Sequence, residues 1–265
     1  MTSLPFFQVD AFASRPFTGN PAAVIPLTEW LPDPLMQSIA AENNLSETAF
    51  LVPRDDDEAD FDLRWFTPTV EVDLCGHATL ASAHVLMESD CARFATRSGI
   101  LTVTRKDGLL WLDLPAGTVE EGREPGLLDA LGLPAETPTF LGRGGNGAAI
   151  ALLDDEASVR SVEPDFRGLK RFDRLVMVTA PGDDSAIASR VFASYHGIDE
   201  DPVTGSAHGS LVPFWAGRLG RKRFDAIQAS ARGGHLECEL VPSPGDDRVI
   251  LGGTCHTVIV GNFQL

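Results

Sequence analysis

Short apolar or alternating runs bounded by glycine, proline or aspartate recur along the whole chain and predict β-strands. The 3.6-residue pattern of a helix is confined to three segments: residues 33–44, 79–88 and 206–215. Because few helices are enclosed by many strands, the pattern favours an α+β fold, with sheets around central helices, over an alternating βαβ array. The expected strands are 5–12, 22–26, 48–52, 61–67, 100–104, 109–114, 137–141, 148–153, 174–179, 236–242, 248–252 and 254–263.

A stretch rich in proline, glycine and glutamate at 115–125 interrupts this pattern. It predicts a boundary between an N-terminal half, residues 1–115, and a C-terminal half, residues 116–254. The segments DLCGHA (73–78) and TGSAHG (204–209) each place a small nucleophilic side chain two residues before a histidine, next to an apolar helix. Matching them pairs Cys75 with Ser206 and His77 with His208, and it suggests an internal duplication.

The charge balance limits the partners that the chain can bind. Asp and Glu total 38 against 21 Lys and Arg, a formal charge of −17. Such a field repels polyphosphates, so we expect no nucleic-acid partner, and the basic triplet at 221–223 is interpreted as a solvated turn. A carboxylated substrate would need a local source of positive potential in its site.

The cysteines and the chain start point to a compartment. The 4 cysteines form no CxxC pattern, which is typical of reduced thiols rather than of a disulfide framework. The first residues show no secretion signal, and no apolar run approaches the about 18 residues that span a bilayer. We therefore expect a cytoplasmic protein without a membrane partner.

Three features could carry chemistry. Small residues at the two expected helix starts leave backbone N–H groups accessible, and the helix dipole makes such an end a carboxylate site. Glu47 lies between a helix and an apolar strand, where it could act as a general acid and base. The alternative is an exposed or amide-capping glutamate. Asp201 precedes the second helix start, where it could cap the helix or orient a histidine.

Other motifs are discounted. The loop 142–147 matches GxGxxG, but a strand follows it instead of the helix that a dinucleotide site needs. A Cys75–His77 nucleophilic pair is disfavoured because residues two apart on a helix point in different directions. Four candidate ligands fit no common zinc spacing, so we expect no metal site: Cys75, His77, His84 and Cys91.

Taken together, four motifs in order resemble the PhzF-like family of phenazine biosynthesis: DAF with GNPAAV (10–24), NLSETAF (44–50), EVDLCGHAT (71–79) and EDPVTGSAHG (200–209). The resemblance implies the fold of diaminopimelate epimerase, with two pseudo-symmetric halves, each a curled mixed sheet around a central helix. It implies an active site between the halves, a C-terminal strand (about 255–265) that returns to the first half, and a homodimer.

The same resemblance implies an isomerase that moves a proton on a small carboxylated substrate without a cofactor. Carried over by motif, Glu47 matches the proton shuttle, and His77 and Asp201 match catalytic polar residues of the pocket. Gln228 is expected at the rim. The full set of expected substrate-binding residues is Cys75, Gly76, Gly205, Ser206, Ala207, His208 and Gln228.

One departure bears on the reaction. Diaminopimelate epimerase and proline racemase use one cysteine from each half, whereas here Cys75 is matched by Ser206. A serine hydroxyl is far too weak an acid to replace a thiolate, so two-base racemisation is disfavoured. Two alternatives stay open: a racemase or epimerase that uses Cys75, with Glu47 as its partner base, and a metabolite-binding relative without turnover.

Overall fold

The computed structural model describes residues 3–142, 147–245 and 247–265, and the contacts within the chain divide it into two units. The first unit takes in Met1–Leu114 and Leu251–Leu265, so both ends of the chain contribute to it. The second unit is Pro115–Ile250. The strand β17 (Arg248–Gly253) carries the chain from the second unit back into the first.

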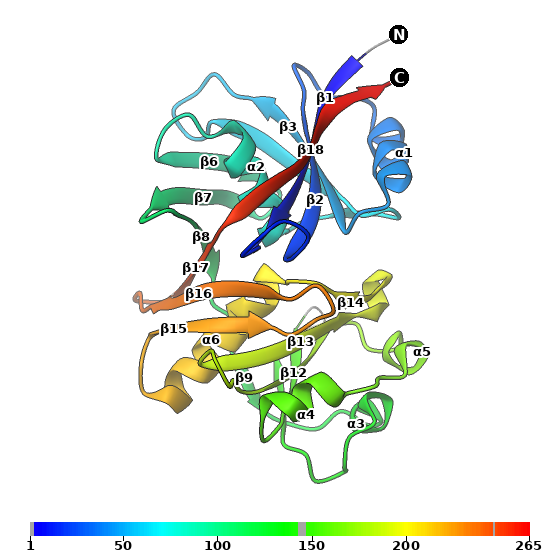
Figure 1. The fold of residues 1–265 in the computed structure, drawn as a ribbon, viewed down its shortest axis with the longest axis vertical. Helices are drawn as coiled ribbons and strands as arrows, with labels where there is room; N and C mark the ends of the chain where they lie inside the picture. The colour runs from blue at the N-terminus through cyan, green and yellow to red at the C-terminus, as the bar shows by residue number, and fades with distance from the viewer. Residues whose placement is uncertain (1–2, 143–146, 246) are drawn as a thin grey trace. The chain divides into compact units, whose positions relative to one another are not determined.

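The first unit contains strands from both ends of the chain and two helices (Figure 1). Its elements are β1 (Ser3–Ala11), β2 (Asn20–Pro26), α1 (Asp33–Asn43), β3 (Glu47–Pro53), β4 (Phe61–Phe66), β5 (Glu71–Val72), α2 (Gly76–Leu86), β6 (Cys91–Thr96), β7 (Gly99–Lys106), β8 (Leu109–Pro115) and β18 (Cys255–Gln264).

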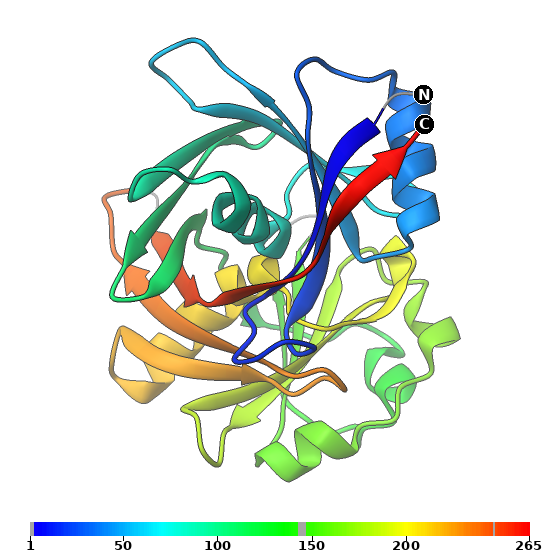
Figure 2. The same cartoon turned by 45° about the horizontal axis from the view of Figure 1, so that its top comes forward.

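The sheet of the first unit is mixed and lies around α2. β1 pairs antiparallel with both β18 and β2, and the two ends of the chain emerge side by side from β1 and β18 (Figure 2). β3 is parallel to β2, β4 antiparallel to β3, and β6 parallel to β4. The helix α2 packs against β1, β2, β3, β7 and β18, and its residues from Gly76 to Ala83 are all buried. A helix that is apolar on every side is stable only in such a central position.

The second unit has the same kind of architecture with more short helices. Its elements are β9 (Val119–Glu121), α3 (Leu127–Leu131), β10 (Thr139–Gly142), β11 (Ala148–Leu152), α4 (Glu156–Ser161), α5 (Phe166–Leu169), β12 (Leu175–Pro181), β13 (Ile187–Ala193), the 3₁₀ turn η1 (Ser194–His196), β14 (Ile198–Asp201), α6 (Gly205–Leu219), β15 (Arg223–Gln228) and β16 (Gly234–Val241).

The strand pairings of the first unit recur in the second. β10 and β11 are antiparallel, β11 and β12 parallel, and β12 and β13 antiparallel. β13 is then parallel to β15, as β4 is to β6, and α6 precedes β15 as α2 precedes β6. The predicted α+β fold with two pseudo-symmetric halves, each a mixed sheet with a central helix, is confirmed.

Two sequence predictions concern the remaining segments. Residues 143–146 of the GxGxxG-like loop (142–147) lie outside the described residues, but the strand predicted after the loop is present as β11. Within the described ranges, no helix combines the length and the apolar character that crossing a bilayer requires.

Candidate functional site

The first cluster of expected site residues belongs to the first unit and begins with Glu47. Asn44 ends α1 in the left-handed conformation (φ 48°), which turns the chain sharply into β3. Glu47 is the first residue of β3, in parallel register with Ala22 of β2. Because β2 and β3 are buried strands, the carboxylate is carried into the interior, and Glu47 is only 9% exposed. A solvated loop glutamate is therefore the wrong interpretation of this residue.

The turn before β2 places a second polar side chain nearby. Gly19 has φ +70°, and a Cβ atom there would lie 2.2 Å from the carbonyl oxygen of Ala11. Glycine is thus required both by the backbone angle and by the space. The turn sets Asn20, which is fully buried, at the start of β2.

The start of α2 supplies the third part of the cluster. Cys75 precedes the first helical turn with extended backbone angles (φ −143°, ψ 112°). Its side chain is therefore not in helical register with His77, and its Sγ lies 3.5 Å from His77 Nδ1. The expectation that these two side chains diverge was wrong, because it placed both residues inside the helix.

His77 links the thiol to the carboxylate. Its Nε2 lies 3.1 Å from Glu47 Oε2, and its Nδ1 lies 3.2 Å from Asn20 Nδ2. Within the described residues, neither His77 Nε2 nor Glu47 Oε2 has a hydrogen bond of standard geometry. Such bonds are often poorly aligned in a free enzyme and tighten when substrate binds.

One donor atom each from Glu47, Cys75 and His77 lies within 4.8 Å of the others, which raises the question of a metal. The two nitrogens of the imidazole, however, face different partners: Nδ1 faces the thiol and Nε2 the carboxylate. A metal ion takes only one nitrogen of an imidazole. The three groups therefore form a relay through His77 rather than a convergent chelate. The other ligands weighed for zinc do not join them: His84 bonds to Thr257, and Cys91 is exposed.

Burial and charge set the protonation states of the cluster. Burial, together with the Glu47 carboxylate, raises the pKa of the Cys75 thiol to about 11. Burial alone would lower the pKa of His77, but its neighbours Cys75 and Glu47 outweigh it and raise that pKa well above its usual value. At neutral pH the cluster therefore holds a protonated thiol beside an imidazolium–carboxylate pair.

The second cluster of expected site residues belongs to the second unit. Asp201 ends β14, and the hydroxyl of Thr204, just before α6, donates to its carboxylate. Gln228 joins them: its Oε1 accepts from the Thr204 backbone N–H at 2.8 Å, and its Nε2 donates to the Asp201 carbonyl at 2.6 Å. Gln228 is fully buried, so its expected place at a pocket rim was wrong, and its amide holds the approach to α6 in place.

The two helix starts correspond in a register different from the expected one. α2 begins at Gly76 after Cys75, and α6 begins at Gly205 after Thr204. Cys75 therefore corresponds to Thr204, not to Ser206, because the matching histidines of the two motifs misled the alignment by two residues. Threonine also lacks a thiol, so the absence of a matched cysteine pair still holds.

The residues four positions later behave alike. The Thr79 hydroxyl donates to the Cys75 carbonyl at 2.6 Å, and His208 Nδ1 lies 2.8 Å from the Thr204 carbonyl. His208 thus corresponds to Thr79 and supports the helix start. Burial lowers the pKa of His208 to about 4, and within the described residues its Nε2 has no hydrogen-bond partner. The imidazole is neutral, with its proton on Nδ1.

Neither α2 nor α6 has a side-chain cap or an acidic residue in its first turn. The first backbone N–H groups of both helices are thus not satisfied by a capping side chain. Gly76 belongs to the first turn of α2, and Gly205, Ser206 and Ala207 form that of α6. The anion-binding character expected of both helix starts is compatible with this geometry.

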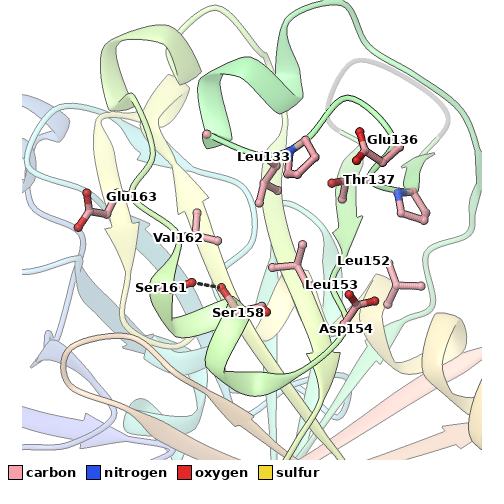
Figure 3. Close-up of a pocket in the computed structure, with 13 residues that line it drawn as sticks. Leu133, Glu136, Thr137, Leu152, Leu153, Asp154, Ser158, Ser161, Val162 and Glu163 are labelled. Carbon is pink, nitrogen blue, oxygen red and sulfur yellow. Dashed lines mark hydrogen bonds between the residues drawn. The ribbon is translucent and has the colours of Figure 1, made fainter.

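A separate hollow of about 540 Å³ lies in the second unit and contains none of the expected site residues (Figure 3). Its wall is apolar at Leu133, Leu153 and Val162. The carboxylates around it do not converge, since Glu163 points away from the other lining side chains (Figure 3). Polar side chains also line the hollow, among them Thr137, Asp154 and Ser158, but no residue of the two clusters described above does.

Comparisons with known proteins agree with these features. Residues 9–261 match the family of phenazine biosynthesis-like proteins (PhzC-PhzF). The chain belongs to the PhzF-like family. It is 49% identical to an uncharacterized isomerase of Pseudomonas aeruginosa over 269 residues, covering 99% of each chain. It is 44% identical to a PhzF-family protein of Enterococcus faecalis, with a TM-score of 0.89 and 100% of both chains covered.

The fold extends to more distant enzymes. A hydroxyproline epimerase of Agrobacterium vitis shares 14% identity and a TM-score of 0.65, with 98% of this chain and 92% of that chain covered, which shows the fold alone. Relatives named isomerases support isomerase activity for this PhzF-like chain in general terms.

Two polar residues of the first cluster escaped the sequence analysis. Asn20 and Ser46 both lie within the family motifs, in GNPAAV and NLSETAF, but neither was singled out. Asn20 contacts His77, and the Ser46 hydroxyl donates to Asn20 Oδ1 at 3.0 Å. A polar side chain between a turn glycine and the proline of a buried strand was the available signal at Asn20.

Proposed function

We propose that this chain is a cofactor-independent isomerase in which Glu47 removes a proton from a carbon atom of a small carboxylated substrate and returns it elsewhere on the same molecule. The observation that carries the proposal is the contact between His77 Nε2 and Glu47 Oε2, 3.1 Å apart and buried. Buried polar atoms without aligned hydrogen bonds are rare in folded proteins and are frequent at catalytic sites. Glu47 is the base, and His77 stabilises the negative charge of its carboxylate.

The start of α2 supports the substrate class. The uncapped N–H groups of its first turn and the helix dipole stabilise negative charge on a carboxylate or on a developing carbanion. A protein of net charge −17 can hold an anion in this way without a lysine or arginine. In the second unit, the first turn of α6 has the same character and is proposed as a further anion-binding end.

The racemase alternative has less support. A racemase base and acid approach opposite faces of one carbon, so their reacting atoms are about 6 Å apart when each is within hydrogen-bond reach of it. Donor atoms of Glu47 and Cys75 lie within 4.8 Å of each other and share His77. Both groups would therefore reach the same face of a substrate, which favours transfer by one shuttle over inversion.

The test is solvent exchange. The protein is incubated in D₂O with a panel of small carboxylates that carry an acidic C–H bond, and deuterium incorporation is followed by mass spectrometry. We expect incorporation that is lost in Glu47→Gln and retained in Cys75→Ser. Exchange that survives Glu47→Gln but is lost in Cys75→Ser would support the racemase. Ligand-induced thermal stabilisation without exchange would support a binding protein.

The homodimer, the cytoplasmic location and the lack of nucleic-acid or membrane partners stay predictions. Size-exclusion chromatography with light scattering tests the first of these directly.

A further inference from the structure

A chain of polar contacts runs behind the base in the first unit. The Ser46 hydroxyl donates to Asn20 Oδ1 at 3.0 Å, and Asn20 Nδ2 lies 3.2 Å from His77 Nδ1. His77 Nε2 in turn lies 3.1 Å from Glu47 Oε2. Asn20 is 0% and His77 3% exposed, so water does not compete strongly for these atoms.

The direction of each contact follows from the chemistry of the groups. An amide oxygen that accepts from Ser46 leaves the NH₂ group of Asn20 facing His77. That NH₂ group has no lone pair to offer and can only donate. His77 Nδ1 is then the acceptor, and the proton of the neutral imidazole must be on Nε2, the nitrogen that faces Glu47.

We propose that Asn20 and Ser46 are positioning residues that keep a proton on His77 Nε2, directed at the carboxylate of Glu47. This inference rests on the proposed function for its catalytic meaning, but the placement of the proton can be measured without turnover. The other neutral tautomer would direct a lone pair of Nε2 at the carboxylate oxygen and repel it.

The consequence for Glu47 is that its two carboxylate oxygens have different roles. Oε2 faces the N–H of His77, which fixes the plane of the carboxylate and stabilises its negative charge. Oε1 is left as the oxygen that takes up and returns the substrate proton. The raised pKa of His77 agrees with this arrangement, since the imidazolium also carries a proton on Nε2.

The contacts of His77 Nδ1 are compatible with both the neutral and the charged form of the imidazole. When the imidazole is charged, its Nδ1 proton can face Cys75 Sγ, 3.5 Å away, or the oxygen of a turned Asn20 amide. The Ser46 hydroxyl can donate or accept, so it supports either orientation of that amide. His77 can therefore gain or lose its Nδ1 proton while Nε2 keeps its own.

The direct test is long-range ¹H–¹⁵N correlation spectroscopy on protein labelled with ¹⁵N-histidine. The chain has 6 histidines, and the signals of His77 are assigned by their loss in His77→Gln. As the pH is raised and the native imidazolium becomes neutral, we expect Nδ1 to lose its proton and Nε2 to keep its own. In Asn20→Asp, which replaces the donor by an acceptor of the same shape, we expect a proton on Nδ1 across a wider pH range. A native His77 whose neutral form carries its proton on Nδ1 would overturn the proposal.

Activity provides a second readout. With a substrate from the exchange panel, Asn20→Asp and Ser46→Ala should lower kcat by about tenfold to a hundredfold with little change in KM, because the base is misplaced while the substrate site is kept. Ser46→Thr should have a kcat close to that of the native protein, since it keeps the hydroxyl. The matched control is Asn43→Asp, because the Asn43 amide bonds to Thr48 Oγ1 instead of His77.

The isomerase function and the positioning role of Asn20 and Ser46 can be refuted independently of each other. If exchange does not depend on Glu47, the proposed function fails, whereas the tautomer of His77 still decides the role of Asn20. If Asn20→Asp does not fold, Ser46→Ala decides: unchanged His77 signals together with an unchanged exchange rate would refute the positioning role. A mixture of tautomers in Ser46→Ala would support it.

Discussion

Cys75 and Thr204 hold equivalent positions, each as the last extended residue before the central helix of its own unit. In each case the backbone carbonyl accepts from the side chain four residues later, from Thr79 in one unit and His208 in the other. Their side chains, however, make different contacts. The thiol of Cys75 contacts an imidazole, whereas the hydroxyl of Thr204 donates to the Asp201 carboxylate.

This difference predicts a structural role for the Thr204 hydroxyl. Thr204→Val removes a buried hydrogen bond to a carboxylate, which should lower the free energy of unfolding by about 1.5–3 kcal/mol. Thr204→Ser keeps the hydroxyl and should cost much less. Urea denaturation of both variants measures the difference. Equal midpoints for the valine and serine variants would show that the bond contributes little.

Cys75 should be chemically inert in the folded protein. With a pKa raised to about 11 by burial and by Glu47, it is almost entirely the unreactive thiol at neutral pH. Cys91 is exposed and serves as the internal reference. Iodoacetamide labelling with peptide mapping should modify Cys91 rapidly and Cys75 only after unfolding. Comparable rates at the two residues would restore Cys75 as a candidate base.

The buried imidazole of His208 should make stability sensitive to acid. Its pKa is about 4 in the folded protein against an ordinary value of 6.5, so between these values the unfolded chain binds a proton that the folded chain does not. The neutral His208 therefore makes its full contribution to the free energy of unfolding above pH 6.5. That contribution is lost as the pH falls toward 4, and the total loss is about 3 kcal/mol.

Comparison with variants isolates this contribution from that of the carboxylates. The difference between native protein and His208→Gln in unfolding free energy should shrink as the pH falls over that range. His235→Gln, at an exposed histidine, is the control and should parallel the native curve. A His208→Gln curve parallel to the native one would contradict the linkage.

Gly19 should tolerate substitution far less well than other glycines that also have a positive φ. Gly19→Ala places a Cβ atom 2.2 Å from the Ala11 carbonyl in addition to the strain of φ +70°. Gly108 has φ +80° but no atom within 4 Å of an added Cβ. We expect a loss of about 1 kcal/mol for Gly108→Ala and a clearly larger one for Gly19→Ala, measured by thermal unfolding. Because Gly19 sets Asn20, its variant should also disturb the His77 signals.

Much of the fold was predictable from periodicity. The helix α1 and the strands β2, β4, β8, β11 and β18 fall close to the expected ranges because each is an apolar run with clear boundaries. The strand β6 was missed, since only Ala92 and Phe94 of its residues are fully buried and Arg93 interrupts the pattern. The helices α3, α4 and α5 are too short to show a helical period.

The candidate site was predictable in part. Glu47, Cys75 and His77 were expected from motifs, and the structure brings them together. Their contact depends on the extended backbone of Cys75 and on the burial of the β3 start, neither of which a single sequence reveals. The contacts of Asn20 and Gln228 join residues far apart in the chain, so a local pattern can mark Asn20 as a buried polar residue but cannot name the partner of either side chain.

The pairing of β18 with β1 also has a consequence for synthesis on the ribosome. The second unit is made of one continuous segment, Pro115–Ile250, whereas β1 waits for a partner strand that is translated more than two hundred residues later. During that interval one edge of β1 is available to other strands. We therefore expect the second unit to acquire its structure first in the nascent polypeptide, and the first unit, with its Glu47 cluster, to mature only once β18 has left the ribosome.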